Sequence, residues 1–302
     1  MIALVLAALA VAAPQPGQHA TIDVSVATLW KAPGLARPID APALRNPVDL
    51  DAWNRNLSTT AARSGLGGRV VTQALYGERV KVLAVRGRWA KVVVPDQPTP
   101  LDRRGYPGWV PLRQLVTGYD GSGPGLTVVT RKALLHLAHR ILPLGYGTRL
   151  PRVGRTASGA WRVRTPDGPG WVARSALAPS PAATGSHVVA AAGRFLGLRY
   201  LWGGVSSWGF DCSGLVWDVF RALGVTVPRD ADPQFRGGRR VSPAALRPGD
   251  LVFYGTPSHV SHVAIYVGGG RMIEAPDSAH AVRIVPLRRG PSLVGARRYT
   301  TG

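Results

Sequence analysis

The chain has a single cysteine, Cys212, and its surroundings favour nucleophilic chemistry. A loop rich in glycine and aromatic residues, 200–210, precedes it. Apolar residues with helical spacing follow it and stop at Gly224. We therefore predict that Cys212 lies in the first turn of a helix, where unpaired N–H groups and the helix dipole favour a thiolate. A lone cysteine is more often a small buried hydrophobic residue, but this position points to a nucleophile.

Three short apolar runs downstream predict strands that would carry a base. Residues 250–254 and 261–267 are typical of buried strands, and residues 271–275 predict a third. The glycines at 268–270 form the turn between the last two. This hairpin places a histidine and a carboxylate on neighbouring strands.

His262 is the base that we predict, and Glu274 is the residue that orients it. If the hairpin folds symmetrically about Gly268, the two side chains lie directly opposite one another, with Cβ atoms roughly 5 Å apart. Nucleophile, base and orienting carboxylate would then follow in the order Cys212, His262, Glu274. His259 is the alternative base, ranked second because an odd offset of three residues places it on the opposite strand face.

Residues 186–300 resemble an NlpC/P60 domain, the papain-like cysteine peptidases of bacterial cell-wall peptides. The pieces that carry the resemblance, in the family's order, are YLWGG at 200–204, DCSGLV at 211–216, VPRD at 227–230, LRPGDLVFY at 246–254 and SHVAIYVGGGRMIEAP at 261–276. The resemblance implies an α+β papain-like fold with Cys212 as nucleophile and His262 as base. The family's third polar residue is usually histidine, sometimes asparagine or glutamine. Here Glu274 stands at that position, and water or His280 could orient His262 instead.

An internal repeat spans residues 20–180. The landmarks YGERV at 76–80, Trp89 and GWV at 108–110 recur as YGTRL at 146–150, Trp161 and GWV at 170–172. Short alternating runs between these landmarks are typical of small all-β units. Both copies resemble bacterial SH3 (SH3b) domains, so the fold class that we predict is a papain-like catalytic domain preceded by two small all-β SH3b barrels.

The predicted domain organisation follows from these landmarks. The first copy has two insertions: a loop at 31–68, and residues 97–107 before its GWV. Long insertions in a small barrel are more often functional than structural. The predicted boundaries are 1–19 for a leader, 20–118 for the first SH3b domain, 123–179 for the second, 180–185 for a linker and 186–302 for the catalytic domain.

The apolar run 2–13 resembles the core of a signal peptide, because it is too short to span a bilayer and is followed by Pro14 and Pro16. We therefore predict an exported protein, located in the periplasm, in the cell wall or outside the cell. If the run is not a signal peptide, the protein would be cytoplasmic. No other stretch of the sequence predicts a membrane span, so the mature form would have no integral membrane segment.

The formal net charge of +21 is large, but only four of the 37 basic residues are lysines, and the arginines are spread over every segment. A general preference for arginine explains this pattern at least as well as a function does. A functional charge would attract an anionic cell-envelope polymer or an acidic peptide. There is no dense basic run with interleaved aromatic residues, so we expect no specific nucleic-acid partner.

The architecture resembles γ-D-glutamyl-L-diamino-acid endopeptidases, which cut murein stem peptides between D-Glu and diaminopimelate or lysine. The resemblance implies that an SH3b domain narrows the cleft and favours peptides with a free N-terminal L-Ala. We expect no cofactor and no metal. The sequence leaves open a catalytically impaired wall-binding protein and an acyltransferase or amidase on the same fold.

Several other residues could contact the substrate or the oxyanion. Tyr200 is a second oxyanion donor beside the backbone N–H of Cys212. Ser213 and Arg229 could hold the α-carboxylate of D-Glu, the arginine through a bidentate pair. The remaining candidates at motif positions are Trp202, Asp211 and Ser261. Alternatively, the residues named in this paragraph have only a structural role, as packing, helix-start or surface residues.

A substrate ammonium in a narrow cleft needs a carboxylate partner. The acidic candidates are Glu78 of the first repeat, Asp211 and Asp230. Tyr106, in the second insertion, is the hydroxyl candidate. The second repeat has Thr148 in place of Glu78 and lacks this insertion, as expected if only the first copy faces the cleft. Alternatively, Glu78 is an exposed turn charge and Tyr106 packs beneath the insertion.

Overall fold

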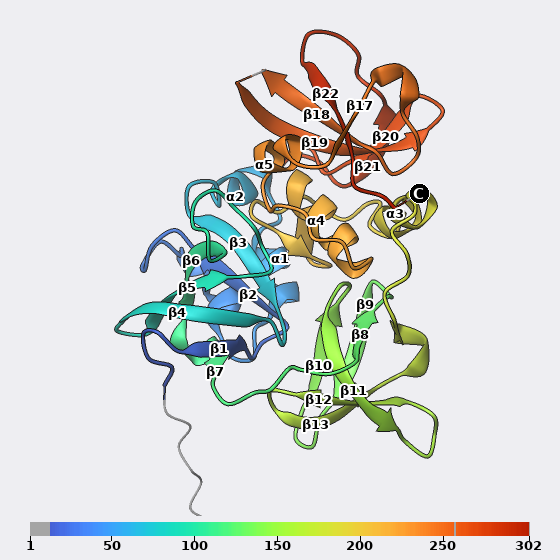
Figure 1. Cartoon of the computed structure of the whole chain (residues 1–302). Helices are drawn as coiled ribbons and strands as arrows, with labels where there is room; N and C mark the ends of the chain where they lie inside the picture. The colour runs from blue at the N-terminus through green and yellow to red at the C-terminus, as the bar shows by residue number, and fades with distance from the viewer. Residues whose placement is uncertain (1–12, 257, 302) are drawn as a thin grey trace, which may run out of the picture.

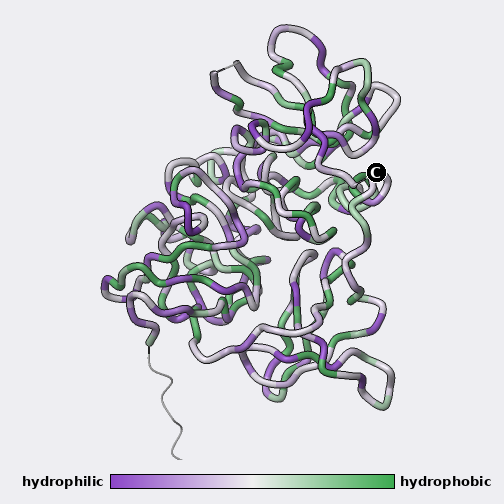
Figure 2. The backbone as a smooth tube through the Cα atoms, viewed as in Figure 1, coloured by the Kyte–Doolittle hydropathy of each residue, from purple (hydrophilic) through white to green (hydrophobic). Residues whose placement is uncertain are grey.

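The computed structural model describes residues 13–256 and 258–301. All but the last residue of the predicted signal-peptide run, 2–13, therefore lies outside the described residues. The described residues form a first β unit, a second β unit and a C-terminal unit (Figure 1). Hydrophobic stretches occur in all three units (Figure 2), and each unit has a buried cluster of its own. Over the described ranges, no helix has the length and apolar character needed to cross a membrane.

The first β unit is a seven-stranded sheet in the order β3-β2-β6-β5-β4-β1-β7. Inward-facing apolar residues such as Val80, Val82 and Val92 fill its core, as expected for strands that alternate between core and solvent. Its strands are β1 (His19–Ile22), β2 (Val26–Trp30), β3 (Val70–Leu75), β4 (Arg79–Arg86), β5 (Trp89–Val94), β6 (Tyr106–Pro111) and β7 (Leu115–Val116), with the short helix η2 (Leu112–Gln114).

The second β unit repeats this arrangement. Its sheet has the order β10-β9-β13-β12-β11-β8-β14, which equals the first order with every strand number raised by seven. The repeat in the sequence therefore corresponds to a repeat in topology. The strands are β8 (Gly125–Val128), β9 (Lys132–His136), β10 (Ile141–Gly145), β11 (Arg149–Arg155), β12 (Trp161–Thr165), β13 (Gly168–Val172) and β14 (Leu177–Ala178), with η3 (Arg174–Ala176).

The insertion at 31–68 differs from the expected loop, because it contains three short helices: η1 (Pro38–Leu44), α1 (Leu50–Asn56) and α2 (Thr60–Ser64). Side-chain caps start two of them, since Asp49 accepts from the N–H of Ala52 and Thr59 accepts from that of Ala62. The apolar faces of these helices pack with Trp208 of the C-terminal unit. The insertion thus joins the first β unit to the C-terminal unit.

The C-terminal unit places helices against a six-stranded sheet in the order β17-β22-β18-β19-β20-β21. Its main core contains Trp217, Phe220 and Phe253. The helices are α3 (Gly185–Gly193), α4 (Cys212–Ala222), α5 (Ala231–Arg236) and η4 (Pro243–Ala245). The strands are β15 (Val205–Ser206), β16 (Gly209–Phe210), β17 (Arg239–Val241), β18 (Leu251–Thr256), β19 (His259–Gly268), β20 (Arg271–Glu274), β21 (Arg283–Pro286) and β22 (Leu293–Arg298).

Helix α4 has a central place in the molecule, between the six-stranded sheet and the two β units (Figure 1). It packs against β19, the strand that carries His262. The predicted helix after Cys212 and the three predicted strands, observed as β18, β19 and β20, are confirmed within one or two residues at each end. Helix and strand together bring the nucleophile and base candidates to one place.

Candidate active site

Cys212 is the first residue of α4, as predicted, and its side chain is half-buried. Asp211 caps the helix by accepting a 2.7 Å hydrogen bond from the N–H of Gly214. Gly214 is required here because a Cβ atom at this position would clash with the carbonyl oxygen of Gly204. The glycine-rich loop therefore lies directly against the first turn of α4. The thiol lies at the helix N-terminus, where the first N–H groups have no partner within the helix.

Asp211 is paired on both carboxylate oxygens. Arg229 binds it through two nitrogens, Nη1 to Oδ1 at 3.0 Å and Nη2 to Oδ2 at 2.7 Å. Oδ2 also accepts from the N–H of Gly203 at 3.0 Å, and Oδ1 accepts from the hydroxyl of Ser213 at 3.3 Å. An unpaired carboxylate beside Cys212 would oppose thiolate formation, but the guanidinium offsets this charge.

His262 and Glu274 are joined by a 2.9 Å hydrogen bond between Nε2 and Oε2. Glu274 is completely buried, whereas the ring of His262 is slightly exposed. Because Nε2 is committed to Glu274, Nδ1 is the ring nitrogen left for the thiol of Cys212. The proximity of the Cys212 thiol is one of the causes that raise the pKa of His262. The three residues thus form a continuous chain of nucleophile, base and carboxylate.

The predicted register of this hairpin was wrong by two residues. The pairs Ile265–Ile273 and Tyr266–Met272 place Glu274 level with residue 264, not with His262. The turn is centred on Gly269 and Gly270, and the pairing shifts between Tyr266 and Gly268 because of a β-bulge. A shift of two keeps both side chains on the same face as diagonal neighbours, roughly 7–8 Å apart at Cα. Two long side chains still bridge this distance.

Two arginines share the Glu274 carboxylate with His262. Arg283 donates Nε and Nη2 to Oε1 at 3.1 and 3.0 Å, and Arg288 Nη1 lies 2.8 Å from Oε2. Arg283 lies opposite Glu274 in the β20–β21 ladder. Burial alone would raise the pKa of Glu274, but hydrogen bonds from His262 and Arg288 outweigh it and lower that pKa to about 2. Glu274 is therefore a permanent anion near neutral pH.

The pKa of His262 shifts in the opposite direction. Burial of the ring lowers it, while hydrogen bonds to Cys212 and Glu274 raise it, with a net result of about 9. The imidazolium is therefore the favoured form at neutral pH when the thiolate faces it. A stable imidazolium can later give its proton to a leaving amine.

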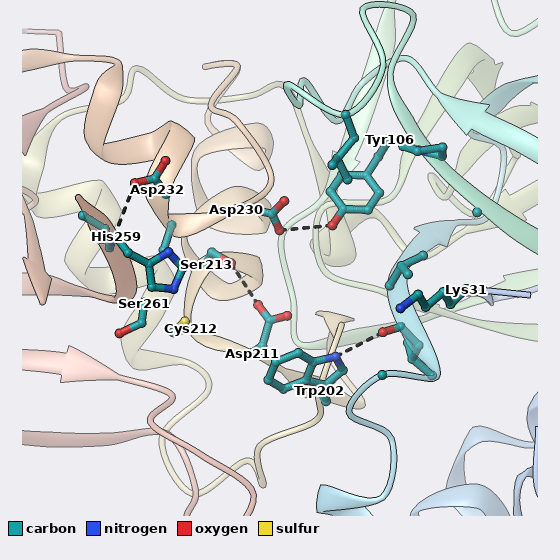
Figure 3. A pocket seen from close by; sticks show the side chains of 18 of the residues that line it. Lys31, Tyr106, Trp202, Asp211, Cys212, Ser213, Asp230, Asp232, His259 and Ser261 are labelled. Carbon is teal, nitrogen blue, oxygen red and sulfur yellow. Dashed lines mark hydrogen bonds between the residues drawn. The ribbon is translucent and has the colours of Figure 1, made fainter. Parts of the chain in front are cut away.

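A cavity of about 720 Å³ opens beside Cys212 (Figure 3). Its walls come from two units, the C-terminal unit on one side and the first β unit on the other. Residues from the first β unit include Lys31, Val71, Lys91, Tyr106 and Trp109. The cavity is thus built at a domain junction, a common place for ligand pockets.

Most of the predicted contact residues line this cavity. They are Tyr106, Tyr200, Trp202, Asp211, Ser213, Asp230 and Ser261. Burial raises the pKa of Tyr200, and the nearby Asp211 and Cys212 raise it further. The Tyr200 phenol therefore keeps its proton and remains a hydrogen-bond donor. Trp202 is 45% exposed and donates its Nε1–H to the carbonyl of Val70 in the first β unit at 3.1 Å.

Tyr106 and Asp230 meet across the junction. The tyrosine hydroxyl donates to Asp230 Oδ1 at 3.3 Å, as Figure 3 shows. Burial raises the pKa of Asp230, and the nearby Arg229 lowers it in part. The alternative that Tyr106 only packs beneath the insertion is therefore wrong, because its hydroxyl reaches the cavity.

Two predicted contacts lie elsewhere. Arg229 is only 1% exposed and does not line the cavity, because its donors are taken by Asp211, Ser213 and Thr72. Glu78 is also buried and outside the cavity, with Oε1 lying 2.8 Å from Nη2 of Arg221 at the far end of α4. Both residues join domains rather than contact substrate. The alternative of an exposed turn charge at Glu78 is wrong as well.

His259, the second-ranked base, also reaches the cavity, and Figure 3 shows its ring on the wall near Ser261 and Cys212. Its ranking assumed uninterrupted alternation along the strand. A register shift between Tyr254 and Gly255 leaves Ser261 without a partner on β18, so the alternation breaks between the two histidines. Only His262 bonds the buried carboxylate, so it remains the better base.

The sequence reasoning missed Arg283 and Arg288. The only available signal was that Arg283 begins the strand that follows Glu274, where a cation can pair across strands with the carboxylate, and this signal is weak among so many arginines. No group of three or more His, Cys, Asp or Glu side chains within the described ranges is arranged to hold a metal ion.

Comparison with known proteins adds to this geometry. Residues 197–294 match the model of the NlpC/P60 family, and residues 63–115 match the bacterial dipeptidyl-peptidase SH3 domain. A γ-D-glutamyl-L-lysine dipeptidyl-peptidase of Bacillus cereus is 38% identical over 93% of this chain and 90% of its own length. The chain belongs to the NlpC/P60 family. Its SH3 domain is of the bacterial dipeptidyl-peptidase type.

Other relatives agree with this family membership. A γ-D-glutamyl-L-lysine dipeptidyl-peptidase of Bacillus subtilis is 35% identical over 88% of this chain and 93% of its own length. The crystal structure of an NlpC/P60 family protein from Bacillus cereus superposes with a TM-score of 0.90 at 37% identity, covering 94% of this chain and 100% of that one. This NlpC/P60 chain is a cysteine peptidase.

Proposed function

We propose that this peptidase hydrolyses the γ-D-glutamyl–L-diamino acid bond of murein stem peptides and releases the N-terminal dipeptide L-Ala-γ-D-Glu. The observation that carries the proposal is the two-domain cavity, where Cys212 lies at one side and the Tyr106–Asp230 pair at the other. The activity of both dipeptidyl-peptidase relatives supports the same substrate class.

The chemistry begins with the thiolate of Cys212 attacking the γ-carbonyl carbon of D-Glu. The carbonyl electron pair moves onto oxygen, and the oxyanion is held by the Cys212 backbone N–H and the Tyr200 hydroxyl. Collapse breaks the C–N bond, and His262 gives its Nδ1 proton to the leaving amine. Water, deprotonated by His262, then hydrolyses the thioester and regenerates the thiol.

Glu274 fixes the tautomer that this mechanism needs. Its carboxylate accepts from Nε2, so Nδ1 takes part in both proton transfers. A charged partner also stabilises the imidazolium formed beside the thiolate. The paired carboxylate argues against the alternative of an impaired, purely binding protein.

The free amine of L-Ala is assigned to Asp230 and Tyr106. The charge of Asp211 is already matched by Arg229, and that of Asp232 by Arg236. Of the three carboxylates that line the cavity, Asp230 is the one without an arginine salt bridge in the described structure, so a substrate ammonium would supply the missing cation and lower the raised pKa of Asp230. Glu78 has no part in this site.

The test compares L-Ala-γ-D-Glu-L-Lys with its N-acetylated form, with products identified by mass spectrometry. The free peptide should yield L-Ala-γ-D-Glu and lysine, and acetylation should lower kcat/KM by about 100-fold because it leaves the buried Asp230 without a cationic partner. Asp230→Asn should reduce the preference for the free amine, and Tyr106→Phe should reduce it less. Equal cleavage of both peptides would reject amine recognition, and no cleavage of either would reject the proposed function.

The finer domain assignment is also a proposal. The identical strand order of the two sheets supports a second SH3b domain at 123–179, beside the first at 20–118. The linker at 180–185 and the catalytic domain at 186–302 complete it. Expression of 123–179 alone should give a folded β protein by circular dichroism, and an unfolded product would argue against an independent domain.

We also propose that the protein is exported and is attracted to anionic envelope polymer. The apolar run 2–13 and the net charge of +21 support these assignments. Binding to purified wall polymer should fall steeply with salt and should be unchanged by Cys212→Ala. Retention in the cytoplasmic fraction would contradict export.

A further inference from the structure

A second pocket, of about 410 Å³, adjoins the catalytic residues on the side of His262 and Glu274. We name it the arginine pocket, after Arg283 and Arg288, which line it together with Asp277. Ser261 lines both this pocket and the cavity beside Cys212, so the two meet there. His262 lines the arginine pocket and not the larger cavity.

The position of His262 decides which part of the substrate enters each pocket. The acyl part remains attached to Cys212, in the larger cavity, while the leaving amine must approach the imidazole that protonates it. Nδ1, which gives the proton, faces the thiol, and Ser261 lines both pockets beside it, so the residue that leaves with the amine is directed past Ser261 into the arginine pocket. This step rests on the proposed function, since it assumes that a γ-glutamyl acyl group occupies the larger cavity.

The pocket offers charges of both signs to a ligand. The Glu274 carboxylate is completely buried, but the side chains of Arg283 and Arg288 are 40% and 44% exposed. Each guanidinium binds Glu274 through only part of its donor set, so N–H groups remain for a second anion. Asp277 is 56% exposed and binds His280 through Oδ1 at 2.8 Å.

We propose that the arginine pocket binds the leaving residue as a zwitterion, with a free carboxylate on Arg283 and Arg288 and a side-chain ammonium near Asp277. The chemical class is a diamino acid that carries at least one free carboxylate. Guanidinium groups match a carboxylate in shape as well as charge, which selects against an amide at the same place. Peptides that end at the diamino acid are therefore better substrates than those in which its carboxyl group is blocked.

The experiment varies only the leaving group of one acyl donor, L-Ala-γ-D-Glu. The peptides carry L-Lys, L-lysinamide or L-norleucine, and a fourth substrate carries p-nitroaniline, which has neither charge. Two further peptides carry meso-diaminopimelate with its L-centre carboxyl free or amidated, to distinguish the near carboxylate from the far one. The parameter measured is kcat/KM, which reports the steps up to acylation.

For the wild-type enzyme, kcat/KM should be about tenfold higher for lysine than for lysinamide, and several-fold higher than for norleucine. Asp277→Asn should remove the difference in kcat/KM between the lysine and norleucine peptides and should lower kcat/KM less for the anilide than for the lysine peptide. Arg288→Gln should lower kcat/KM about tenfold more for the lysine peptide than for the anilide. Arg288 also binds Glu274, so the substitution disturbs the carboxylate that holds His262. This effect lowers kcat/KM for both substrates alike and cancels in the comparison.

Equal kcat/KM for the lysine and lysinamide peptides in the wild-type enzyme would overturn the proposal. An equal loss of kcat/KM for the lysine peptide and the anilide in Arg288→Gln would also overturn it. The second outcome would mean that the arginines serve only to balance Glu274. Cleavage of the anilide with no leaving-group preference would reject this inference and leave the proposed function intact. Failure of the wild type to cleave any of the substrates would reject the proposed function itself.

Discussion

Replacing Glu274 by Gln should change both the rate and the pH dependence of this peptidase. The substitution keeps the shape of the side chain but removes the charge that lies 2.9 Å from His262. It also leaves Arg283 and Arg288 without their common anion, so two cations face the ring unopposed. Both effects disfavour the imidazolium.

The size of the effect follows from the pKa of His262. The rise from 6.5 to about 9 corresponds to about 3 kcal/mol, and Glu274 is one of the two groups that produce it. Loss of this carboxylate should lower kcat/KM by about tenfold to 300-fold. The basic limb of the pH–rate profile, where the imidazolium loses its proton, should move to lower pH by roughly one to two units.

The assay is kcat/KM for L-Ala-γ-D-Glu-L-Lys as a function of pH, with Arg283→Gln as the matched control. Removing one cation beside the ring favours the imidazolium, so the control should leave the basic limb in place or move it to higher pH. A basic limb in Glu274→Gln that coincides with that of the wild type would refute the assignment of Glu274 as the charged partner of His262.

The remaining predictions concern the catalytic pair and the domain junction. Cys212→Ala and His262→Ala should each abolish peptide hydrolysis with unchanged circular dichroism, and turnover by either variant would exclude its assigned role. Burial raises the pKa of Glu78 from 4.5 to about 7. The free energy of unfolding should therefore be highest below pH 4.5 and should fall by about 3 kcal/mol as the pH rises through 7. Glu78→Gln should flatten this dependence in urea denaturation, whereas an unchanged slope would mean that the carboxylate is not buried in solution.

The sequence was sufficient for features that depend on local patterns. Helical spacing after Cys212 predicted α4, and the alternating runs around the glycines at 268–270 predicted the hairpin of β19 and β20. The pairing of His262 with Glu274 was predicted through an incorrect register, and it survived because a shift of two residues preserves the strand face. A bulge cannot be recognised from alternation alone.

Features that depend on contacts between domains were not predictable in this way. Arg229 and Glu78 both lie in motifs, and a motif does not say which neighbour a long side chain will meet. Arg229 turns inward to Asp211 and Thr72, and Glu78 meets Arg221, over 140 residues away in sequence. Their burial follows from the docking of the first β unit on the C-terminal unit, which no local pattern encodes.

Helix α4 connects this docking to catalysis. Its first residue is Cys212, and its last turn carries Arg221, which binds Glu78 of the first β unit and donates to the carbonyl of Gly147 in the second. Trp217, between them, donates to the carbonyl of Asp96 at 3.1 Å. The first β unit is therefore held by the same helix that presents the nucleophile, and the cavity wall that it contributes keeps a fixed distance from the thiol. Because that wall carries Tyr106, the proposed amine recognition implies that domain docking sets the distance from the amine to the scissile bond and so limits the released product to a dipeptide.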